Sequence, residues 1–123
     1  MWEAIQASGN GVERIGSRAV PDGNKRLAVP GDSIIALLLN KESYERGLSR
    51  KAMNNKVQKI GGNSNLTIVG KNHHFEVFMN PNNAQVEIGD STFATTVEAL
   101  VGAADADGGL EAAATVMTAL GLL

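Results

Sequence analysis

Two acidic residues, Asp32 and Glu98, stand beside strongly apolar stretches of the sequence. Asp32 opens the apolar run Ile34–Leu39, and Glu98 lies among the apolar positions that include Val97 and Val101. A partly buried carboxyl group has a raised pKa, which suits general acid–base catalysis, and carboxylates also bind divalent cations. The alternative for Asp32 is a helix-start carboxylate favoured by the helix dipole, and for Glu98 a solvated position at the edge of a helix.

Further candidate site residues lie in a basic stretch of the sequence and in a pair of adjacent histidines. The most basic stretch lies between residues 46 and 59, and we predict phosphate contacts from its helix face, with a solvated face as the alternative. The RNA-contact candidates are Lys51, Asn55, Lys56 and Lys59. His73 and His74 are adjacent, so they do not share a face and are not expected to hold one metal ion. His74 is either a surface loop residue or a general base.

The composition limits what this chain can be. Its 123 residues and 43% hydrophobic content fit one folded domain spanning 1–123. Cysteine is absent, which excludes a disulfide framework, a thiol nucleophile and a Cys-ligated zinc site. A net charge of −2 argues against an overall basic footprint, so RNA would need a local patch, and 4% aromatic residues disfavour base stacking. No signal-peptide or membrane-spanning pattern is present, which predicts an intracellular protein.

The apolar spacing predicts an all-α domain of five to seven short helices. A helix over 31–40 is apolar on nearly every side, begins or kinks at Pro30, and is expected to bury part of its surface against a second copy of the chain. Residues 12–24 are predicted to be irregular, with no β hairpin, and 80–87 a loop. The other predicted helices cover 1–8, 50–60, 64–70, 93–104 and 110–120.

Two segments resemble the catalytic domain of the ribonuclease III family. RLAVPGDSIIALLL, residues 26–39, is similar to the family signature E-x-L-E-F-L-G-D-A, which opens a buried helix. TTVEALVGAADADGGLEAA, residues 95–113, matches the second family motif, D-x-x-E-A-L with a following D-G-G, over nine or ten positions in one register. The resemblance covers roughly residues 24–120 and looks most like the compact fungal branch, which has no double-stranded-RNA-binding domain.

This resemblance implies an all-α, multi-helix ribonuclease III-like domain that homodimerises through the signature helix and holds duplex RNA in a valley across the dimer. It also implies a cluster of four carboxylates around Mg²⁺, with Mn²⁺ as a substitute. Asp32 matches the signature Asp, and Glu98 matches the Glu of the second motif, so both are the expected metal ligands and catalytic residues.

The sequence departs from the family at the other two ligand positions. The metal-binding Glu of the signature falls on Ala28, and the Asp of the second motif falls on Thr95. The family's outer Glu falls on Lys25, and an aromatic position of the family falls on Asp105. Lys25, Thr95, Asp105 and His74 are therefore accessory candidates only. Asp105 shares a helix face with Glu98 but lies about 10 Å along the axis, too far to chelate the same ion.

Three functions follow as hypotheses. The first is a metal-dependent double-stranded-RNA endoribonuclease with an incomplete acidic site. The second is a catalytically degenerate member that serves as an RNA-binding or assembly scaffold. The third is a fold repurposed as a small-molecule enzyme, with Asp32 and Glu98 as acid–base groups.

Overall fold

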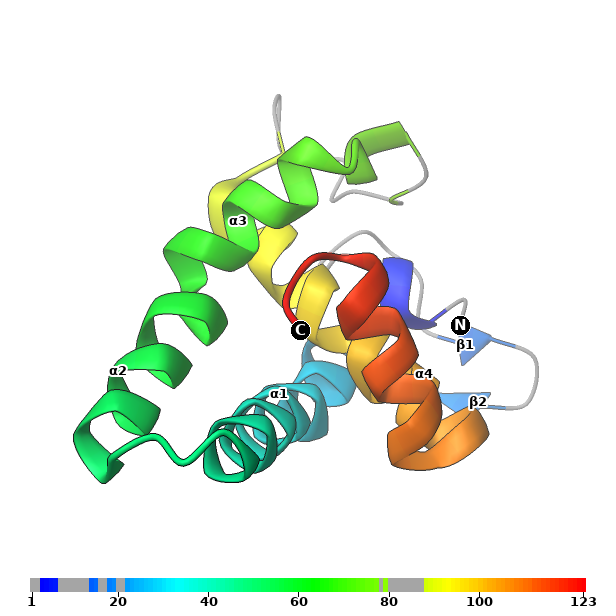
Figure 1. Cartoon of the computed structure of the whole chain (residues 1–123). Helices are drawn as coiled ribbons and strands as arrows, with labels where there is room; N and C mark the ends of the chain where they lie inside the picture. The colour runs from blue at the N-terminus through cyan, green and yellow to red at the C-terminus, as the bar shows by residue number, and fades with distance from the viewer. Residues whose placement is uncertain (1–2, 7–13, 16–17, 20–21, 78, 80–87) are drawn as a thin grey trace.

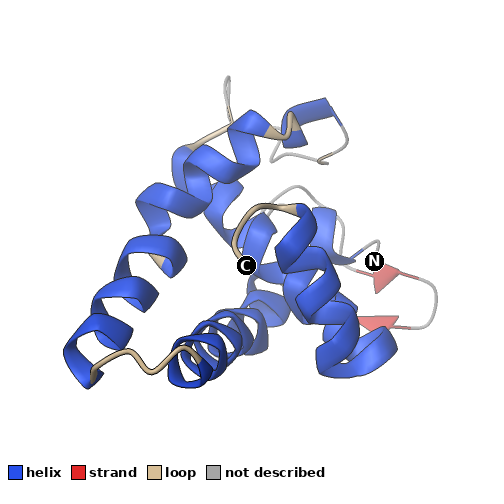
Figure 2. Cartoon of the chain, in the orientation of Figure 1, coloured by secondary structure: helices blue, strands red, loops and turns tan. Residues whose placement is uncertain are grey.

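The computed structural model describes residues 3–6, 14–15, 18–19, 22–77, 79 and 88–123. It is mainly helical, which confirms the all-α class (Figure 2). Within the described residues, none of the helices combines the length and the apolar character that crossing a membrane requires. The predicted loop at 80–87 lies outside the described residues, and so do residues 1–2 and 7–8 of the predicted helix over 1–8.

Four α-helices form the framework (Figure 1). Helix α1 spans Lys25–Glu45, α2 spans Arg50–Gly61, α3 spans Asn63–Asn72, and α4 spans Asp90–Ala119. Helix α4 turns a corner at Gly109, whose φ of 74° interrupts the helix, so the expected turn between two helices is confirmed there. We call this corner, residues 105–111, the elbow.

Two 3-10 turns and one pair of short strands are the other elements of the described residues. The turn η1 spans Glu3–Ile5, and η2 spans Phe75–Val77. Strands β1, Arg14–Ile15, and β2, Arg18–Ala19, pair antiparallel with Arg14 opposite Ala19. The prediction of no hairpin in 12–24 was therefore wrong, although two residues per strand do not change the fold class.

The core lies where α1 and α3 pack against α4. Its fully buried side chains include Ile35 and Leu39 of α1, Leu66 of α3, and Val97 and Met117 of α4. Helix α2 contributes no buried residue and packs on this core through partly buried Val57 and Ile60. Helices α2 and α3 follow one another along the side of α1 and α4, and we call them the arm (Figure 1). Within the arm, α3 packs into the core and α2 lies at its edge.

The start of α1 differs from the prediction. The helix begins at Lys25 rather than near residue 31, and Pro30 lies inside it. Its first turn is fixed by distant contacts, because the buried Asn24 amide donates hydrogen bonds to the Ala4 carbonyl at 2.9 Å and to Thr96 Oγ1 at 3.0 Å. Within the single chain Leu37 is 43% exposed.

Candidate functional site

Helices α1 and α4 cross so closely that their backbones touch at two glycines. A Cβ atom placed on Gly31 would lie 1.8 Å from the carbonyl oxygen of Glu98, and one placed on Gly102 would lie 2.4 Å from that of Leu27. Real Cβ atoms do not approach a backbone oxygen so closely, so only glycine fits both positions. The contact brings Asp32, the residue after Gly31, to the turn of α4 that carries Glu98.

The side chains of Asp32 and Glu98 form a hydrogen-bonded carboxyl pair at this crossing. Burial is the largest cause that raises the pKa of Glu98, followed by the hydrogen bond with Asp32 and by the negative charge of Asp32; together they raise it to about 8. Glu98 is half-buried and Asp32 is exposed. Glu98 therefore keeps its proton at neutral pH, and the exposed Asp32 opens the pair to solvent.

A small-residue cluster occupies the place where the family has its metal-binding Glu. Ala28 is 7% exposed and packs with Ala4 of η1 and with Ala99 and Ala103 of α4. Thr95, at the other departed position, is half-buried on α4. A carboxylate at residue 28 would displace this apolar contact.

A buried polar link near the pair was not recognised in the sequence. Asn24 joins η1 to α4 through Ala4 and Thr96, and Thr96 Oγ1 in turn donates to the Thr92 carbonyl at 2.8 Å. Thr96 lies two residues before Glu98, so the link fixes the turn of α4 that carries the pair. The only sequence signal was an Asn directly before the helix, which is also an ordinary capping residue.

The pair offers two carboxyl groups to a divalent cation. Among the described residues, no group of three or more His, Asp or Glu side chains converges on one point. Mg²⁺ needs hard oxygen ligands, and sites that use one or two carboxylates complete the shell with water and substrate phosphate. Asp32 and Glu98 fit such a site when Glu98 releases its proton.

The remaining accessory candidates are not gathered at the pair. Lys25 is exposed at the start of α1, and Asp105 is half-buried at the first residue of the elbow. His74 lies in the turn after α3, with φ 54°, and its Nδ1 atom is 3.5 Å from Glu76 Oε1. That turn lies at the opposite side of the molecule from α1 (Figure 1).

The predicted RNA-contact residues divide into two groups on α2. Lys51, Asn55 and Lys59 are exposed and face solvent together. Lys56 is instead directed toward α1, where its Nζ atom is 3.5 Å from Glu42 Oε1 and its side chain is only 20% exposed. Glu42 also pairs with Arg46 at 3.3 Å. The patch available to phosphate therefore lacks Lys56.

Comparison with known proteins adds no family to this geometry. No protein-family model matches the sequence, and no curated protein matches it. The functional argument therefore depends on the carboxyl pair, on the tight crossing that forms it, and on the exposed lysines of α2.

Proposed function

We propose that this chain is a ribonuclease III-like protein that hydrolyses double-stranded RNA with a divalent cation held by Asp32 and Glu98. The observation that carries the proposal is the convergence of these two carboxyl groups, 66 positions apart in the sequence (98 − 32), at the crossing of α1 and α4. In the two motifs that resemble the family, Asp32 and Glu98 are also the metal-ligand positions at which this sequence has an acidic residue.

The pair has a direct role in binding. Glu98 would release its proton when the pair binds Mg²⁺ or Mn²⁺, because a carboxylate must be deprotonated to act as a ligand. The chemistry that such a cation supplies is stabilisation of the charge on the transferring phosphoryl group. Glu98 is fixed by the packing of α4, whereas exposed Asp32 can reach substrate in solvent.

The rest of the proposed assembly concerns RNA and a second copy of the chain. The exposed face with Lys51, Asn55 and Lys59 supplies phosphate contacts, which position a duplex without reading its sequence. A homodimer through α1 would place two such sites across one duplex. Support for it comes from the exposed apolar side chains of α1, Val29 at 68% and Leu37 at 43%.

Cleavage of a generic duplex RNA tests the proposal. The parent chain is compared with Asp32→Asn and Glu98→Gln, each with Mg²⁺, Mn²⁺ or a chelator, and Asp22→Asn serves as a control that removes an exposed charge just before α1. We expect metal-dependent cleavage that falls roughly 100-fold or more in both site variants and is unchanged in the control. Cleavage that survives in both site variants would overturn the assignment.

A catalytically degenerate RNA-binding scaffold is the second candidate function. The packing of Ala28 against Ala4, Ala99 and Ala103 favours it, because this contact closes the position of a third carboxylate. Retention of duplex RNA on a filter without cleavage would support the scaffold. If the chain neither retains nor cleaves RNA, the raised pKa of Glu98 would instead favour acid–base chemistry on a small molecule.

A further inference from the structure

All of the Lys and Arg residues of this chain lie in its first part. These eleven basic residues, together with six Asp or Glu residues, precede Asn72, whereas the other seven acidic residues follow it. The formal charge is therefore +5 over 1–71 and −7 over 72–123. The second part includes all of α4, so every surface that α4 forms by itself is neutral or acidic.

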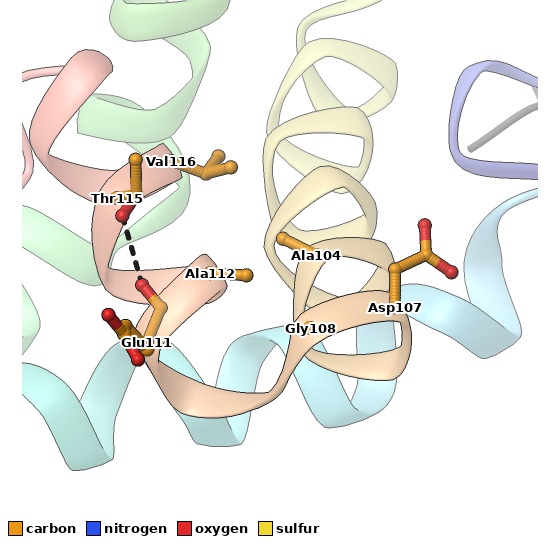
Figure 3. Close-up of a pocket in the computed structure, with 7 residues that line it drawn as sticks. All are labelled: Ala104, Asp107, Gly108, Glu111, Ala112, Thr115 and Val116. Atoms are coloured by element: carbon orange, nitrogen blue, oxygen red, sulfur yellow. Dashed lines mark hydrogen bonds between the residues drawn. The ribbon is translucent and has the colours of Figure 1, made fainter.

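A groove lies inside the bend of α4, between the two limbs of the helix that meet at the elbow. Its volume is about 570 Å³. Figure 3 shows Ala104 of the first limb, and Ala112 and Val116 of the second, directed into it. The Thr115 hydroxyl in the lining is already used, because it donates a hydrogen bond to the Glu111 carbonyl at 3.0 Å. The floor of the groove therefore offers mainly apolar contacts.

Carboxylates flank this groove on both sides. Figure 3 shows the Asp107 side chain on the outer side of the first limb and the Glu111 side chain on the outer side of the second. Both are exposed, and no ion pair joins either one to another described side chain. Leu110, between them in the elbow, is 38% exposed. These flanks repel phosphate and favour a ligand that is apolar in the middle and positively charged on either side.

The lining residues form two rows at helical spacing. Ala104 and Gly108 are four residues apart on the first limb, and Ala112 and Val116 are four residues apart on the second. Rows at this spacing are the ridges between which another helix packs, and three of these four side chains are small enough to let its backbone approach closely. The groove therefore suits a helical segment better than an extended one.

The described helices of this chain do not supply such a segment to a second copy. The most basic of them, α2, already packs Val57 and Ile60 on the core of its own molecule, and α3 buries Leu66 there. The basic residues of the arm therefore come without a free apolar face. A partner that fits the groove must be a different protein.

We propose that the elbow groove is a docking site for a basic amphipathic helix of a partner protein. The apolar face of that helix lies between the two limbs, and Lys or Arg residues on its flanks lie against Asp107 and Glu111. Charge complementarity selects this occupant, since α4 has no Lys or Arg of its own. The site goes beyond the proposed function, because the RNA-contact residues Lys51 and Lys59 are on α2.

Fluorescence anisotropy of labelled synthetic peptides tests the proposal in a buffer that contains neither RNA nor metal. The peptides are about 15 residues long, which is enough to form a helix on binding. The basic peptide has Leu at i, i+3, i+4 and i+7 and Lys on both flanks of this face. The acidic peptide replaces each Lys by Glu, and the scrambled peptide keeps the basic composition but spreads Leu around the helix.

Two variants alter the groove in different ways. Asp107→Lys with Glu111→Lys reverses the charge of its flanks, and Ala112→Leu fills its floor without changing the charge. Asp22→Lys with Glu45→Lys is the matched control, because it changes the net charge equally at two exposed carboxylates outside the elbow. Circular dichroism of every variant establishes that the helices remain folded.

We expect the parent chain to bind the basic peptide roughly tenfold or more tightly than the acidic or the scrambled peptide. The flank variant should lose roughly tenfold or more of this affinity, and its difference from the parent should shrink between about 0.05 M and about 0.5 M salt. Ala112→Leu should lose a similar factor at both salt concentrations. The control should bind within about twofold of the parent, because its charges are far from the groove and screened.

Three results would overturn the proposal. They are a parent that binds the basic and the scrambled peptide equally, a control that loses as much affinity as the flank variant, and binding that survives both groove variants. A parent that binds duplex RNA but none of the peptides would also overturn it and leave the proposed function standing. Selective peptide binding without any RNA cleavage would support the docking site and count against the nuclease alone.

Discussion

The α1–α4 crossing and the α2–α3 arm use opposite ways of presenting chemical groups. At the crossing, the backbones of α1 and α4 touch at Gly31 and Gly102, and this contact holds Asp32 next to Glu98. On the arm, α2 buries no residue completely and holds Lys51 and Lys59 on an exposed face. A partly buried site can shift the pKa of a carboxyl group. The charges on an exposed helix face are screened by solvent and salt, and their side chains are free to move.

The largest expected effect is the loss of the close crossing in Gly31→Ala. The added Cβ would lie 1.8 Å from the backbone oxygen of Glu98, which cannot move without shifting α4. We expect a loss of about 3 kcal/mol or more in the free energy of unfolding, measured by urea denaturation.

Gly61→Ala, at the end of α2, is the matched control for this substitution. Its Cβ would lie 3.3 Å from a methyl group of Ile35, a side chain that can adjust, and alanine favours the helix. We expect a change within about 1 kcal/mol. Equal losses for the two variants would contradict the distinction between crossing and arm.

An intermediate effect is expected from the pH dependence that Glu98 gives to stability. The pKa of Glu98 is about 8 in the folded chain and near 4.5 when unfolded, so between these values the folded state retains a proton that the unfolded state has lost. Stability therefore falls as pH rises through this window. Because the side chain is only half-buried, solvent screening reduces the loss, and we expect roughly 1–3 kcal/mol by pH 8.

Glu98→Gln should remove this part of the pH dependence. The amide cannot ionise, so the variant should match the parent near pH 4 and exceed it at pH 8 in urea denaturation. Glu111→Gln, which removes an exposed carboxylate at the end of the elbow, should follow the parent curve throughout. A parent whose stability does not fall above pH 4.5 would show that the pair is not buried enough to hold its proton.

The sequence predicted the arm better than the crossing because the arm follows local rules. The expected helix over 50–60 is observed as Arg50–Gly61, and the expected cap at Ser49 is confirmed, since Ser49 Oγ accepts a hydrogen bond from the Ala52 N–H at 3.1 Å. These features depend on residues within one turn, which spacing and capping preferences describe directly.

The crossing depends on contacts between distant residues, which periodicity does not describe. Asn24 extends α1 past Pro30 by bonding Ala4 and Thr96, 20 and 72 positions away. The sequence pattern around Gly31 and Gly102 does not predict that these two residues touch. The pairing of Asp32 with Glu98 was expected only through the family resemblance. The missed strand pair had a short-range signal, the Gly16-Ser17 dipeptide, of a type common in two-residue hairpin loops.

The smallest stability effects are expected on the arm, where Lys51→Ala and Lys59→Ala separate RNA binding from folding. Both side chains are exposed, so each substitution should change the free energy of unfolding by no more than about 0.5 kcal/mol. Each should nevertheless weaken retention of duplex RNA about equally for all sequences, and lower the salt dependence of binding by roughly one phosphate contact.

Lys56→Ala is the internal comparison for these two variants, because the ion pair with Glu42 directs Lys56 toward α1. We expect it to cost about 0.2–1 kcal/mol of stability and to leave the salt dependence of RNA binding unchanged. If Lys56→Ala lowers that salt dependence as much as Lys51→Ala does, its side chain must leave Glu42 for phosphate. The arm would then rearrange on binding, and the contrast with the fixed crossing would be sharper still.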